Sequence, residues 1–117
     1  MTGALSHQCG LAAEAQVVEH YRRRGHGQLR RRWRGRAGEI DLIARDGEGL
    51  IFVEVKRARS FARAAERVTR RQLARIAAAA SEFLAAMPAG QLTPARIDVA
   101  LVDGRGCVEI IENAYGH

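Results

Sequence analysis

Apolar and polar residues alternate along two neighbouring segments of the chain, which predicts two β-strands. The first strand is expected over residues 39–44 and the second over residues 50–56, each with a period of two. Between them, residues 46–49 read Asp-Gly-Glu-Gly, a composition typical of tight turns. The two segments are therefore predicted to form a β-hairpin.

The N-terminal part of the chain is predicted to form an amphipathic helix over residues 6–24. Ser6 is a suitable N-cap, and Gly25 stands where helices commonly end. Glu14 lies at the edge of the apolar face, so it is either a solvated helix charge or part of a neighbouring site. The residues expected on the apolar face are Cys9, Ala13, Val17, Val18 and Tyr21.

A second amphipathic helix is predicted over residues 70–87. Thr69 and Gln72 match a capping box at its start, and Pro88 cannot continue it. Its apolar stripe is typical of core packing and indicates no further function. The stripe consists of Leu73, Ile76, Ala80, Phe83 and Met87.

Three further segments complete the predicted order of elements. Residues 95–102 and 107–111 have the composition of strands. Residues 28–34, where Trp33 stands among arginines, are either an edge strand facing phosphates or a solvated loop. The resulting order, α-β-β-β-α-β-β, predicts a single α/β domain over residues 1–117 with helices flanking a mixed sheet.

The predicted hairpin brings four charged side chains together. With the turn centred on residues 47–48, Asp41 lies opposite Glu54, and Glu39 lies opposite Lys56. All four share one face, and directly opposed Cβ atoms lie about 4.5–5.5 Å apart. The other face is predicted to be core and carries Ile40, Leu42, Ala44, Ile51, Val53 and Val55.

The opposed carboxylates of Asp41 and Glu54 predict a site for Mg²⁺ or Mn²⁺. Two like charges destabilise a strand pair, whereas a divalent cation between them would bind favourably. Mg²⁺ is commonly held by one or two carboxylates together with water and phosphate oxygens. Glu39 is an additional candidate on the same face. The alternative is an exposed hairpin face on which Glu39 pairs with Lys56.

Lys56 is the only lysine among the 19 lysine and arginine residues of the chain. A lysine ammonium is a compact charge, suited to orienting a water or stabilising negative charge on a phosphoryl group. The alternative is that a single lysine occurs at this position by chance.

The net charge of +6 favours a polyanionic partner, nucleic acid before an anionic membrane. No apolar run approaches the roughly 20 residues of a membrane span, and the N-terminus lacks a signal-peptide pattern. Cys9 and Cys107 are typical of ordinary thiols in a cytoplasmic protein. Arginines expected to contact phosphates are Arg32, Arg34, Arg36, Arg57, Arg59, Arg70 and Arg71.

The blocks Gly38-Glu39-Ile40-Asp41 and Val53-Glu54-Val55-Lys56 resemble the PD-(D/E)XK nuclease superfamily. Nearly the whole chain resembles the YraN-like family of bacterial proteins, which is related to Holliday-junction resolvases. Further matching residues are Gly10, Glu14, Tyr21, Gly25, Trp33, Arg34, Phe52, Val68, Thr69, Gln72, Ile97, Asp98 and Val99.

The resemblance implies a restriction-endonuclease-like core and a metal-dependent endonuclease acting on DNA, including branched repair or recombination intermediates. It implies that Asp41 and Glu54 are metal ligands, Lys56 the catalytic base and Glu14 a helix-borne acid of the same site. Arg32 departs from the family, which often has asparagine there. Residues 59–66 lack the glycine and proline common in the family.

Two other functions remain open at this point. One is a non-catalytic nucleic-acid-binding module that keeps the nuclease fold. The other is a protein-interaction adaptor, for which the sequence contains no motif. Junction cleavage would favour a symmetric homodimer.

Overall fold

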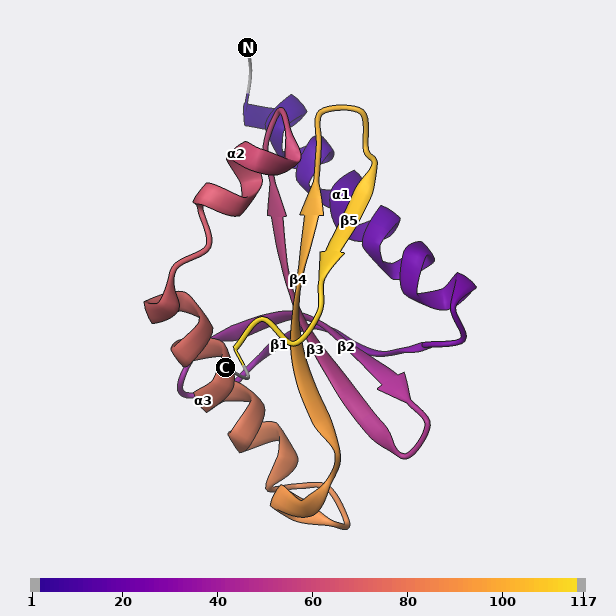
Figure 1. Ribbon diagram of the computed structural model, residues 1–117, viewed down its shortest axis with the longest axis vertical. Helices are drawn as coiled ribbons and strands as arrows, with labels where there is room; N and C mark the ends of the chain where they lie inside the picture. The colour runs from indigo at the N-terminus through magenta and orange to yellow at the C-terminus, as the bar shows by residue number, and fades with distance from the viewer. Residues whose placement is uncertain (1–2, 116–117) are drawn as a thin grey trace.

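Five strands form one mixed sheet with helices on both faces (Figure 1). The computed structural model describes the backbone of residues 3–115 and the side chains of residues 12–115. Strands β3 and β4 are parallel, and all other neighbouring strands are antiparallel. This architecture confirms the predicted α/β fold. The strands, in both chain and sheet order, are β1 (Gln28–Arg34), β2 (Glu39–Asp46), β3 (Gly49–Arg57), β4 (Ala95–Val102) and β5 (Val108–Ile111).

Each face of the sheet buries its own hydrophobic cluster. Helix α1 (Gly3–Arg23) packs Ala13, Val17 and Tyr21 onto one face. Helix α3 (Arg70–Leu84) packs on the other face, with Leu73 and Ile76 among its buried residues. The central strands are therefore buried on both sides, as in sheets covered by helices on two faces.

The hairpin register matches the prediction from the turn. Paired residues run from Asp46–Gly49 at the turn to Leu42–Val53. Gly47 has φ of +60° at the first central position of a two-residue turn, a conformation that glycine adopts without steric cost. The pairing stops at Leu42–Val53, just before Asp41 and Glu54 would face each other.

The connection from β3 to β4 contains a helix that the sequence analysis did not predict. Helix α2 (Phe61–Glu66) is capped by Ser60, whose hydroxyl accepts the N–H of Arg63 at 3.2 Å. The predicted capping box of Thr69 and Gln72 is present at the start of α3. A 3₁₀ turn, η1 (Gly90–Leu92), precedes β4.

Two predicted helix ends are wrong. Helix α3 ends at Leu84 rather than Met87, because its last turn tightens: the N–H of Met87 bonds to the carbonyl of Leu84, three residues back. Helix α1 begins at Gly3, so Ser6 lies inside the helix and is not its N-cap. Ala4 and Leu5 are good helix formers and extend the helix past Ser6. The expected place of Cys9 on the apolar face lies outside the described side chains.

Segment 28–34 is a strand at the edge of the sheet and not a loop, and its contact with phosphates stays a prediction. Trp33 does not face outward with its arginine neighbours. Its ring packs edge-on against Phe83 of α3, with ring centroids 5.3 Å apart. The tryptophan therefore anchors the edge strand to the core.

Candidate functional site

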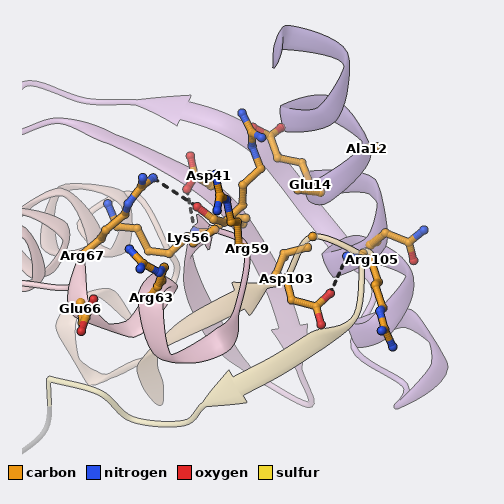
Figure 2. A pocket seen from close by; sticks show the side chains of 18 residues that line it. Ala12, Glu14, Asp41, Lys56, Arg59, Arg63, Glu66, Arg67, Asp103 and Arg105 are labelled. Atoms are coloured by element: carbon orange, nitrogen blue, oxygen red, sulfur yellow. Dashed lines mark hydrogen bonds between the residues drawn. The ribbon is translucent and has the colours of Figure 1, made fainter. Parts of the chain in front are cut away.

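A cavity of about 1160 Å³ lies where β3 and β4 end (Figure 2). Its walls come from α1, the end of β3, α2 and the connection between β4 and β5, and Asp41 reaches it from β2. Glu14 and Lys56 also line it. Three of the predicted site residues, far apart in sequence, are thus brought into one pocket.

Asp41 is fixed by a backbone group of the neighbouring strand. The N–H of Val55 donates to Asp41 Oδ2 at 2.8 Å. Because the backbone pairing of β2 and β3 has already ended at Leu42–Val53, the Asp41 carboxylate supplies the acceptor for this N–H. The aspartate is therefore oriented by the fold and does not depend on a partner side chain for its position.

Asp41 and Glu54 form a hydrogen-bonded pair of acids. Burial in the first place, and the charge of Glu54 in the second, raise the pKa of Asp41 to about 7, whereas the hydrogen bond from the Val55 N–H lowers the pKa. Glu14 contributes a smaller increase through its charge. The raised pKa of Asp41 reflects the cost of burying a second negative charge beside Glu54, a cost that a bound cation would also offset.

Lys56 pairs with Glu54 and not with Glu39. Its Nζ lies 3.1 Å from Glu54 Oε2, and the two side chains are only 16% and 18% exposed. Glu39 instead pairs with Arg34 at 3.3 Å on the surface and does not line the pocket. The alternative Glu39–Lys56 pair is therefore wrong. The prediction that all four residues share one face is also wrong for Glu39, because the alternation along β2 breaks between Ile40 and Leu42.

The regular alternation fails at Asp41 because β1 is irregular beside it. Arg32 has φ of 52° and lies between the pairs Arg31–Leu42 and Trp33–Ile40, where it faces Asp41. As a result, Ile40 packs in the cluster under α3, whereas Leu42 packs in the cluster under α1. The predicted core face, which placed both residues on one side, is corrected accordingly.

Glu14 is held by two arginines of β1. Its Oε1 lies 3.0 Å from Arg32 Nε and 3.4 Å from Arg31 Nη2, and its side chain is 19% exposed. Glu14 is therefore neither a solvated helix charge nor free to act as a ligand in this arrangement.

The arginines expected to contact phosphates lie in three places. Arg57 and Arg59 line the pocket, and Arg32 contacts Glu14 at its edge. Arg34 and Arg36 lie at the connection between β1 and β2, and Arg70 and Arg71 are exposed at the start of α3. Sequence reasoning missed Arg63, Arg67 and Arg105, which also line the pocket. The four-residue spacing of Arg59, Arg63 and Arg67 could have indicated the first two.

The acids present fit a magnesium-type ion better than a self-sufficient metal centre. Among the described residues, no three His, Cys, Asp or Glu side chains are arranged to hold a metal. Zinc sites need three or four protein ligands, whereas Mg²⁺ is held by one or two carboxylates with water and phosphate oxygens. Asp41 and Glu54 meet the second requirement, since they supply two neighbouring carboxylates.

No helix within residues 3–115 is both long and apolar enough to cross a membrane.

Comparison with known proteins gives one consistent family. Residues 13–102 match the model of the uncharacterised protein family UPF0102. A UPF0102 protein of Ruegeria pomeroyi is 62% identical over 115 residues, covering 98% of this chain and 94% of the relative. One from Cereibacter sphaeroides is 59% identical over 115 residues, covering 98% of both chains. One from Dinoroseobacter shibae is 46% identical over 104 residues, covering 89% of this chain and 78% of the relative. The chain belongs to the uncharacterised protein family UPF0102.

Proposed function

We propose that this protein binds nucleic acid and hydrolyses phosphodiester bonds as an endonuclease dependent on Mg²⁺ or Mn²⁺, with DNA as the substrate. One observation carries the proposal: the half-buried acids Asp41 and Glu54 are hydrogen-bonded to each other, with the ammonium of Lys56 3.1 Å from Glu54. Burying two acids together is unfavourable without a cation or proton between them. That the two acids nevertheless lie together, next to Lys56 and near a pocket lined by arginines, supports a catalytic role.

Each residue of the site has a distinct part in the proposed reaction. Asp41 and Glu54 would hold the ion, with Asp41 kept in orientation by the N–H of Val55. A bound divalent ion would polarise the phosphoryl oxygen and lower the pKa of its water. Lys56 would orient the attacking water or stabilise negative charge developing on the phosphoryl oxygens. A contribution from Glu14 would require its release from Arg31 and Arg32.

The test compares the wild type with Lys56→Arg and Asp41→Asn in two assays, Mn²⁺-dependent thermal stabilisation and DNA cleavage. Lys56→Arg keeps the charge but replaces a compact ammonium with a planar fork. It should retain Mn²⁺ stabilisation and lose cleavage on the order of 10²-fold, since a displacement of about 1 Å has that effect. Asp41→Asn should lose both responses. Binding of Mn²⁺ at 100 times its Kd stabilises the folded state by about 2.7 kcal/mol.

Glu48→Gln is the matched control, because Glu48 is an exposed acid in the hairpin turn, away from the site. It should behave as the wild type in both assays. Equal Mn²⁺ stabilisation of the wild type and Asp41→Asn would exclude the metal site. Near-wild-type cleavage by Lys56→Arg would exclude its role. A wild type that binds DNA but cuts none would favour the non-catalytic binding module.

A further inference from the structure

Three arginines with a spacing of four residues line one side of the pocket. Arg59 precedes α2, Arg63 lies within it, and Arg67 forms its C-cap. Four residues of helix advance about 6 Å and return nearly to the same face, which places Arg63 and Arg67 side by side, whereas Arg59 lies just before the N-cap residue Ser60. Figure 2 shows the three side chains gathered on the side of Lys56, with Glu14 and Arg105 on the opposite side. They form a row of cations leading to the candidate site.

These cations are largely available to a ligand. Within the part of the chain whose side chains are described, the guanidinium groups of Arg59, Arg63 and Arg105 form no ion pair and no hydrogen bond. Arg67 donates to the backbone carbonyl of Arg57 at 3.2 Å, which leaves its charge without a carboxylate partner. The pocket therefore keeps positive charge in an accessible position.

The acids of the pocket do not cancel this charge, because six lysine and arginine residues line it against four acids, Glu14, Asp41, Glu66 and Asp103. Glu14 is already paired with Arg31 and Arg32. Asp103 accepts the backbone N–H groups of Arg105 and Cys107, both at 2.9 Å, and so holds the β4–β5 connection. Glu66, exposed on α2, offsets one arginine at most.

The size and lining of the pocket point to a polymer. Its volume of about 1160 Å³ exceeds the roughly 300–1,000 Å³ of most small-molecule sites. Those sites are mainly apolar and aromatic, whereas no Phe, Tyr or Trp occurs among the described residues that line this one. Without aromatic rings for base stacking, contacts fall on the sugar–phosphate backbone and carry no base preference.

We propose that this pocket binds one unpaired nucleic-acid strand, such as the single-stranded arm of a branched substrate, and guides it along α2 to Lys56. The pocket is bounded by α1 on one side and by α2 on the other, with Arg105 facing the row of arginines. One strand can pass between these walls with its phosphates toward the arginines, and preference over a duplex is what the binding comparison below decides. This inference rests on the proposed function, whose site lies at the end of the path.

Binding measured in EDTA tests the strand path separately from cleavage, because EDTA removes the divalent cations on which the proposed cleavage depends. A short labelled DNA strand and the corresponding duplex would be titrated with the wild type and Arg59→Gln/Arg63→Gln at several salt concentrations. Arg24→Gln/Arg45→Gln is the matched control, since it removes the same charge from exposed residues outside the pocket. The wild type should bind the single strand more tightly than the duplex. Arg59→Gln/Arg63→Gln should lower the salt-dependence slope by about 1.4, or about 0.7 per lost phosphate contact, and the control should leave the slope nearly unchanged.

Three results would overturn the strand path: no binding of either DNA at low salt, tighter binding of the duplex, or equal losses in the two double variants. The proposed function is tested by separate measurements, Mn²⁺ stabilisation and DNA cleavage. Arg59→Gln/Arg63→Gln should keep the full Mn²⁺ stabilisation, because it leaves Asp41 and Glu54 intact. The wild type could bind the single strand as expected and yet show neither Mn²⁺ stabilisation nor cleavage. That result would support the strand path and contradict the proposed nuclease activity.

Discussion

Asp41 shows how a single side chain acquires unusual chemistry from its surroundings. The Val55 N–H fixes it, the fold half-buries it, and Glu54 lies within hydrogen-bonding distance. Desolvation and the neighbouring acid together favour the protonated form, which explains why its pKa is raised to about 7 from an ordinary value of 3.8. In the folded, metal-free protein Asp41 therefore keeps a proton that the unfolded chain releases.

This difference predicts that metal-free stability falls as pH rises. Below about pH 4 Asp41 is protonated in both states and has no effect. Between pH 4 and 7 the folded state binds the extra proton, so the free energy of unfolding decreases with pH, and above pH 7 the loss is complete. Asp41→Asn lacks this titration. In EDTA it should gain on the order of 2 kcal/mol relative to the wild type between pH 5 and pH 8.

Urea unfolding of both proteins at the two pH values measures this gain, and other titrating groups cancel in the comparison. Glu48→Gln should track the wild type, because it removes an exposed acid of the hairpin turn. A constant stability difference between wild type and Asp41→Asn across this range would contradict the prediction.

At the level of elements, β1 shapes the site through one irregular residue. Arg32 adopts a left-handed conformation, with φ of 52°. It lies in β1, which pairs with β2, at the position next to Asp41. This conformation costs a non-glycine residue about 1–2 kcal/mol, and asparagine tolerates it best among the others. The asparagine that the resemblance implies at this position is therefore explained by the backbone, and the arginine here is maintained at a cost in stability.

Comparison of Arg32→Asn with Arg32→Ala isolates this cost. Both variants remove the ion pair with Glu14, but only asparagine accommodates the left-handed backbone. Arg32→Asn should be more stable than Arg32→Ala by about 1 kcal/mol, equivalent to roughly 4 °C in Tm for a chain of this size. Thermal melts at neutral pH measure the difference. An alanine variant as stable as the asparagine variant would show that the backbone relaxes at this position.

The same irregularity marks the limit of prediction from the sequence. The turn fixed the register of β2 and β3 because hairpin pairing is local, and Asp41, Glu54 and Lys56 followed from it. The faces predicted for Glu39 and Ile40 were wrong, since the prediction assumed that side chains alternate regularly along the whole strand. Helix α2 was not predicted, because its six residues cover less than two turns and are too few to show a helical period.

At the scale of the whole molecule, a buried carboxylate joins three distant segments. Asp98 of β4 has 0% exposure and accepts hydrogen bonds from Tyr21 Oη of α1 at 2.7 Å, Arg96 Nε at 3.0 Å and the Asn113 N–H at 3.0 Å. The network ties α1 and the C-terminal segment to the sheet. Since Tyr21 and Asp98 are 77 residues apart, no local pattern could pair them, and the sequence analysis assigned them only through the resemblance.

Tyr21→Phe tests how much this network contributes to global stability. The substitution keeps the buried ring and removes one charge-assisted hydrogen bond to Asp98, which should cost about 1.5–3 kcal/mol. For a chain of this length that loss corresponds to a Tm lower by roughly 6–12 °C. Tyr115→Phe is the control, because the Tyr115 hydroxyl has no hydrogen-bond partner among the described residues, and it should change Tm by little. Equal Tm values for the two variants would mean that Arg96 and the Asn113 N–H satisfy Asp98 without the tyrosine. A selective loss in Tyr21→Phe, with Mn²⁺ stabilisation retained, would separate the network that holds α1 on the sheet from the acids that form the candidate site.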